Sequence, residues 1–170
     1  MEKTSRETCL HPAGKDRPAV MVQKDHPEIE FRGCMDTLDA AFLLTAVLAQ
    51  KENDEAVAGA LWEMQAFARS ITRAHATMTP MEMTELMHLT PERIHVLSHN
   101  PPGGWLHMGK DTTELMAYVN LLRTQVRTAE RAAVRAFRGR DDIIGALNIL
   151  SSAVHVLLCR MQAEQKGIQV

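Results

Sequence analysis

Three charged side chains, Arg123, Arg127 and Glu130, fall close together on a helix that the sequence predicts between residues 111 and 137. With about 100° of rotation per residue, Arg127 lies about 40° to one side of Arg123, and Glu130 lies about 20° to the other side. Fixed cations of this kind can neutralise charge that develops on a phosphate group. The same spacing also occurs in ion-pair ladders on solvated helix faces, so spacing alone leaves both interpretations open.

The helix that carries these charges must also pack against other elements. Apolar residues recur along it every three or four positions and form one stripe beside the charges. A capping pattern at residues 111–114 opens the helix, and a turn at residues 138–141 ends it. The stripe consists of Leu115, Val119, Leu122, Val126, Ala129 and Ala133.

A second polar line runs along the last predicted helix, residues 142–165. This helix is apolar on most sides, so its uncharged polar groups must find partners in other side chains, water or a ligand. A purely structural hydrogen-bond network and a ligand site both remain possible. The polar line consists of Asn148, Ser151, Ser152, His155 and Cys159.

The first predicted helix covers residues 35–51, with Asp36 in its first turn. Between residues 40 and 49 only Thr45 is polar, and a helix that is apolar on all sides is surrounded by protein. Asp36 then lies at the N-terminal end of a buried helix. It serves either as a cap of the free backbone N–H groups or as the partner of an arginine.

Between these helices the sequence predicts a helix at residues 54–76 and two short helices near residues 80–88 and 91–97, each short one opened by a Thr-Pro pair. The short helices carry Glu-x-x-His motifs that end at His88 and His95, but adjacent short helices do not match the long core helices of di-metal bundles. In the turn-rich loop 98–110, Trp105 is either an anchor packed on the bundle or a lid over a ligand.

Residues 1–30 read as an extended arm with one short strand near residues 19–22. Within this arm, Lys24 and the segment 14–16 could contact an anion. Cys9 and His11 are half of a zinc ligand set, and a structural zinc site needs four ligands, so we expect no resident metal.

Composition limits the remaining possibilities. The 170 residues suffice for one domain with a core, and a net charge of −2 gives no general attraction to nucleic acid or to an anionic membrane. No apolar run reaches 18 residues and no signal pattern opens the chain, so we expect a cytoplasmic protein without a membrane span. The three cysteines suit reduced thiols. The predicted fold is all-α, an antiparallel four- or five-helix bundle over residues 31–166.

Four stretches in order resemble the ATP:corrinoid adenosyltransferases, closest to the ethanolamine-utilisation type and more distantly the propanediol-utilisation type. The likeness extends over residues 22–162. The stretches are residues 22–39, with Lys24-Asp25 and Asp36; the Leu-Ser-His-Asn-Pro turn at residues 97–101; the Asn-Leu-Leu-Arg-Thr-Gln-Val-Arg-Thr-Ala-Glu run at residues 120–130; and the Asp-Asp-Ile-Ile-Gly-Ala-Leu-Asn-Ile-Leu-Ser-Ser-Ala-Val run at residues 141–154.

The resemblance implies a helical bundle that assembles as a homotrimer with active sites between subunits, and that transfers the adenosyl group of ATP to a reduced cobalamin. ATP, Mg²⁺ and the corrinoid would be bound, and a B12-dependent enzyme or a microcompartment could be a partner. By the same resemblance, Arg123 would pair with Asp36, Arg127 would contact the polyphosphate, and Glu130 would orient the arginines or help hold the magnesium–nucleotide complex.

Two further contacts follow from the same likeness, in which Asn148 would reach the nucleoside and Lys24 the phosphates. Trp105 is one candidate for the aromatic residue that displaces the lower cobalt ligand. The sequence departs from the family in its N-terminal phosphate loop, in the Cys-rich metal-binding stretch and at Ile149, where the family has arginine. The alternative function is therefore a non-catalytic bundle that binds a corrinoid or a nucleotide as a carrier.

Overall fold

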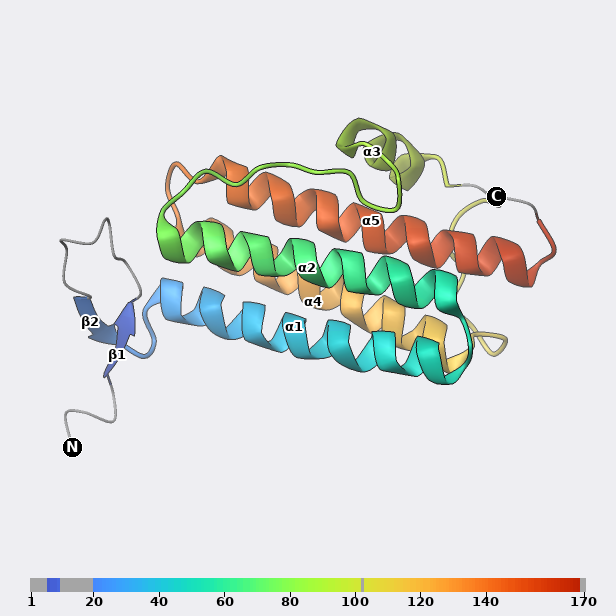
Figure 1. Cartoon of the computed structure of the whole chain (residues 1–170), viewed down its shortest axis with the longest axis horizontal. Helices are drawn as coiled ribbons and strands as arrows, with labels where there is room; N and C mark the ends of the chain where they lie inside the picture. The colour runs from blue at the N-terminus through green and yellow to red at the C-terminus, as the bar shows by residue number, and fades with distance from the viewer. Residues whose placement is uncertain (1–5, 10–19, 102, 169–170) are drawn as a thin grey trace.

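Four long helices form an antiparallel bundle in a computed structural model that describes residues 6–9, 20–101 and 103–168 (Figure 1). The helices are α1 (Pro27–Lys51), α2 (Glu55–Thr77), α4 (Glu114–Ala136) and α5 (Asp141–Gln165), and a short helix, α3 (Pro91–His99), lies on α5. Around the bundle, α1 packs against α2 and α4, and α5 packs against the other sides of α2 and α4. The predicted all-α fold is confirmed.

Apolar side chains at helical spacing build the core. On α1 the buried positions follow one another by three or four residues, beginning with Phe31, Met35, Leu38 and Phe42. The same spacing continues on α4, where the predicted stripe is fully buried. The helix α5 is long and apolar enough to cross a membrane, but most of that length is buried among the other helices, as expected for the core helix of a bundle.

The expected start of the first helix was wrong, because α1 begins at Pro27 and not near residue 35. The imidazole Nδ1 of His26 accepts the N–H of Glu28 at 3.2 Å, and Pro27 occupies the first helical position. Asp36 consequently lies in the third turn of α1, where it cannot cap the helix. The short strand is confirmed as β2 (Val20–Gln23), which pairs antiparallel with β1 (Arg6–Cys9).

The expected helix at residues 80–88 is also wrong. This segment instead runs back along the bundle from the end of α2 to the start of α3 (Figure 1). Residues 79–85 have no helical structure, and an extended chain covers roughly twice the distance per residue that a helix covers, which suits a segment that runs along the bundle. Two hydrogen bonds fix its start, from Arg140 to the carbonyl of Thr79 (2.8 Å) and from the Met81 N–H to Asp142 (2.8 Å).

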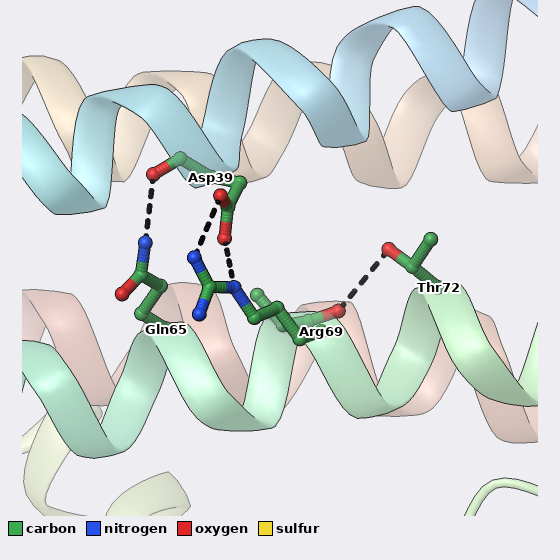
Figure 2. A network of polar contacts seen from close by, with 5 residues as sticks. Asp39, Gln65, Arg69 and Thr72 are labelled. Carbon is green, nitrogen blue, oxygen red and sulfur yellow. Dashed lines mark hydrogen bonds and ion pairs between the residues drawn. The ribbon is translucent and has the colours of Figure 1, made fainter.

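A polar connection aligns α1 with α2 (Figure 2). Arg69 donates to both carboxylate oxygens of Asp39, at 2.6 and 3.0 Å, and Gln65 donates to the Asp39 carbonyl at 3.1 Å. A bidentate arginine–carboxylate pair fixes direction as well as distance. It therefore links α1 to α2 at one defined position along both helices.

The face of α1 that points away from the bundle was expected to be covered by protein, and in this chain it is exposed. Leu44 is 55% exposed and Val47 is 49% exposed, and Leu43 lies beside them. We refer to Leu43, Leu44 and Val47 as the α1 apolar face. Exposed apolar residues that adjoin in this way are typical of surfaces that contact another protein.

Candidate functional site

A polar pocket lies between α4 and α5, where α3 approaches them. Its volume is about 250 Å³, and its wall includes both predicted arginines, Arg123 and Arg127. The remaining lining residues are neutral and polar: Ser98, Ser151, Ser152 and His155. Guanidinium and hydroxyl groups are hydrogen-bond donors, so the pocket suits an anionic ligand with several acceptor oxygens.

Glu130 joins the two helices at the edge of this pocket. Its Oε1 accepts a hydrogen bond from Asn148 Nδ2 of α5 at 3.2 Å, and its Oε2 lies 3.1 Å from Nη1 of Arg127. The carboxylate is largely buried, with 14% of its side chain exposed, whereas the Arg127 side chain is 49% exposed. Glu130 therefore holds one terminal nitrogen of Arg127, and the half-exposed guanidinium has further N–H groups that could donate to a ligand.

Arg123 is held in a different way. Its Nε donates to the side-chain oxygen of Asn120, one turn earlier on α4, at 3.3 Å. No hydrogen bond or ion pair between residues that the structure describes joins Arg123 to Asp36, and Asp36 is exposed on α1. The structure thus brings Arg123, Arg127, Glu130 and Asn148 together and leaves Asp36 outside their pocket.

The surroundings of His155 in this pocket lower the pKa of its imidazole. Burial lowers the pKa of its imidazole, and the positive charge of Arg123 and the neighbouring His99 lower this pKa further. Its Nδ1 is buried without a hydrogen-bond partner among the described residues, and its Nε2 lies 3.7 Å from the Cys159 thiol. Burial raises the pKa of Cys159 to about 11, so this thiol is a poor nucleophile at neutral pH.

The α5 polar line predicted this side of the pocket, whereas Ser98 was given no role from the sequence and was recognised as a lining residue from the structure. Ser98 stands near the end of α3, and its hydroxyl donates to the carbonyl of His95 at 2.8 Å. Short-range spacing cannot reveal it, because α3 reaches the pocket through a loop and not through a shared helix face. The Leu-Ser-His-Asn-Pro stretch was the signal that singled out this segment.

The remaining predicted residues lie elsewhere. Lys24 is exposed in the turn between β2 and α1. Trp105 is 72% exposed, which excludes the expected anchor role within this chain. The side chain of Gln162 anchors the backbone of this loop instead. It accepts a hydrogen bond from the His107 N–H at 2.7 Å and donates one to the Trp105 carbonyl at 3.2 Å.

The metal-ligand and anion-binding motifs considered in the sequence do not form a second site among the described residues. No group of three or more His, Cys, Asp or Glu side chains that could hold a metal ion occurs in residues 20–101 and 103–168. Glu85 and His88 do not share a helix face, because residues 80–88 are not helical. The 14–16 segment and His11 lie outside the described residues, as does the side chain of Cys9.

Comparison with known proteins identifies the family to which this chain is similar. The model of the cobalamin adenosyltransferase family matches residues 14–161. The corrinoid adenosyltransferase EutT of Salmonella typhimurium (strain LT2) is 34% identical over 152 residues, which cover 81% of this chain and 54% of that protein. EutT of Escherichia coli (strain K12) is 32% identical over 173 residues, which cover 89% of this chain and 62% of that protein.

The chain spans only about half to three-fifths of the length of these curated relatives: 54% of the first and 62% of the second. No solved structure matches the chain significantly. The family match covers all of α1 to α4 and most of α5, which are the elements that carry the pocket. On this evidence the chain belongs to the cobalamin adenosyltransferase family.

Proposed function

We propose that this chain transfers the 5′-deoxyadenosyl group of ATP to a cobalt(I) corrinoid, with adenosylcobalamin and tripolyphosphate as products. The observation that carries the proposal is the α4–α5 pocket, in which two arginines meet neutral hydrogen-bond donors. The names of the relatives support the same reaction, since both are corrinoid adenosyltransferases.

The proposed reaction requires no general base from the protein, because cobalt(I) is already a strong nucleophile. Cobalt(I) supplies the electron pair that forms the Co–C bond at the ribose C5′, while the C5′–O bond breaks and its electron pair stays on the leaving tripolyphosphate. Holding the two reactants in line can contribute roughly 7–11 kcal/mol. The second requirement is positive charge at the leaving group, which fixed arginines and a metal–nucleotide complex can meet.

In this proposal Arg127 binds the polyphosphate and Glu130 orients Arg127. Of the two roles that the family likeness allows for Glu130, we favour orientation of Arg127, because Oε2 lies 3.1 Å from Nη1 of Arg127 and Oε1 accepts a hydrogen bond from Asn148. The buried Oε2 has no hydrogen-bond partner among the described residues, so its contact with Arg127 is an ion pair. Mg²⁺ would then arrive with the phosphates of ATP. Asn148 contacts the nucleoside, and Lys24 contributes charge to the phosphates from the N-terminal side.

We further propose that the active site is completed by a second copy of the chain in a homotrimer. The pocket of about 250 Å³ is smaller than the 300–1,000 Å³ typical of complete ligand sites, so one chain would hold only part of the ligands. The α1 apolar face is suited to contact with another subunit. Asp36 lies exposed on the same helix, which allows it to reach Arg123 of a neighbouring subunit rather than of its own.

The corrinoid itself would contact the exposed side of the pocket. The Trp105 ring is free to lie against the apolar edge of a corrin, which is consistent with the lid interpretation of its loop. We propose a cytoplasmic location, with or without enclosure in a bacterial microcompartment, and delivery of the product to a B12-dependent enzyme.

An anoxic spectroscopic assay tests the reaction. The protein is mixed with ATP, Mg²⁺ and cobalamin reduced to cobalt(I), and the visible spectrum is followed against a control without protein. We expect the cobalt(I) band to disappear as light-sensitive adenosylcobalamin forms, with one tripolyphosphate released per turnover. A shifted cobalt(II) spectrum without tripolyphosphate release would instead support the carrier function.

A further inference from the structure

A second and larger cavity lies on another side of α5. Its volume is about 500 Å³, and it separates the N-terminal half of α2 from the C-terminal half of α5. It shares no lining residue with the α4–α5 pocket. The volume falls within the range of small-molecule sites, and the proposed adenosyl transfer makes no use of it.

The inner wall of the cavity is apolar. Val57 of α2 and Leu157 and Met161 of α5 line it and are buried. Small residues of α2, Ala56, Gly59 and Ala60, border the opening. A Cβ atom built on Gly59 meets no atom within 4 Å, so the glycine borders open space and not a neighbouring side chain.

A strained turn closes a third side. Leu86 and Leu89 exchange backbone hydrogen bonds of 3.0 and 2.9 Å, and the two residues between them, Met87 and His88, have φ angles of 54° and 58°. This left-handed conformation is unfavourable for residues other than glycine. Glu63 holds the turn by accepting the Met87 N–H at 2.8 Å, which sets Met87 into the wall and His88 at the rim.

The charged groups at the rim decide which ligand the cavity would accept. Glu55, Glu63 and Glu164 line it together with one cation, Arg160. Arg160 precedes Glu164 by one helical turn, a spacing at which opposite charges offset each other. The rim thus carries three carboxylates and one guanidinium above an apolar floor, and one of the carboxylates, Glu63, also accepts the Met87 N–H. We propose that this cavity binds a small organic ammonium compound with an apolar body.

A direct test uses hexylamine as the probe, with hexanoate and hexan-1-ol as probes of the same length and different charge. The intact chain is labelled at its methionine methyl groups and titrated by NMR. We expect hexylamine to shift the Met87 and Met161 signals and to leave that of Met83, which does not line the cavity, unchanged. Hexanoate should bind at least tenfold more weakly. Equal binding of hexanoate, or no shift at Met87 and Met161, would overturn the proposal.

Variants locate the binding within the cavity. Gly59→Phe fills the open space and should abolish the hexylamine shifts, whereas Gly59→Ala leaves most of the volume and should retain them. Glu55→Gln should weaken hexylamine binding about threefold to tenfold, and the exposed Glu82→Gln, outside the cavity, should have no effect. Retention of binding in a folded Gly59→Phe protein would overturn the proposal, and the wild-type titration decides the matter if that variant does not fold.

Discussion

Glu130 of α4 accepts a hydrogen bond from Asn148 of α5 at 3.2 Å while its second oxygen pairs with Arg127 at 3.1 Å. One carboxylate thus connects Arg127, proposed to bind the polyphosphate, to the helix proposed to contact the nucleoside. This connection is local, because the three side chains lie on adjacent faces of two packed helices. Its loss should alter ligand binding more than folding.

Glu130→Gln should raise the KM for ATP about threefold to tenfold, because Arg127 loses the charged partner that fixes its orientation. Steady-state kinetics at several ATP concentrations measure this change. Glu114→Gln, at the exposed start of α4, is the matched control and should leave the KM unchanged. An unaltered KM in Glu130→Gln would contradict the orienting role.

Arg127→Ala should lower turnover by about 10²-fold or more, as expected when a donor that stabilises developing charge is removed. The helical content measured by circular dichroism should stay the same, because the arginine side chain is half exposed. Arg131→Ala, one turn further along α4 and exposed, should retain wild-type turnover. Wild-type activity in Arg127→Ala would exclude the proposed polyphosphate contact.

Asp36→Ala and Arg123→Ala should each be strongly impaired, and their effects should be non-additive in the double variant if the two side chains pair. Mixing the two inactive single variants adds a sharper measurement. If the pair forms between subunits, random reassembly leaves about a quarter of the interfaces with both native residues, so activity should return to roughly that fraction. A pair within one chain would give no recovery.

Leu44→Glu should weaken self-association, because it introduces a charge at the centre of the α1 apolar face. Sedimentation velocity over a range of concentrations should show trimers for the wild type and smaller species for the variant. Gln50→Glu places the same charge near the exposed end of α1 and serves as the control. An identical sedimentation profile for Leu44→Glu would assign the apolar face to another partner.

Arg140→Ala should destabilise the bundle by about 1–2 kcal/mol at neutral pH, because Arg140 bonds both Asp142 and the Thr79 carbonyl. The pKa of Asp142 is lowered from 3.8 to about 2, first by the Arg140 hydrogen bond and further by the backbone N–H groups of Met81 and Ile143 and the charge of Arg140. A depressed carboxyl pKa contributes stability that is fully present above pH 4 and is lost as the pH falls toward 2. The difference in melting temperature between wild type and Arg140→Ala should narrow over that range.

Most of the bundle could be predicted from the sequence because helical periodicity is a local property. The stripes of α4 and α5 and the Thr-Pro start of α3 depend only on residues within a few turns, and these elements were found within a few residues of their true bounds. The conformation of segment 80–88 could not be predicted in this way, because it depends on where the end of α2 and the start of α3 lie in the folded bundle.

For the candidate site, sequence alone determined which charges stand together on α4, since Arg123, Arg127 and Glu130 share one helix face by their spacing. Only the tertiary structure decided that Asn148 bonds Glu130, that Ser98 and His155 complete the pocket, and that Asp36 stays outside it. These relations depend on how α3, α4 and α5 pack. The packing is set by burial of side chains far apart in the sequence, which no local pattern encodes.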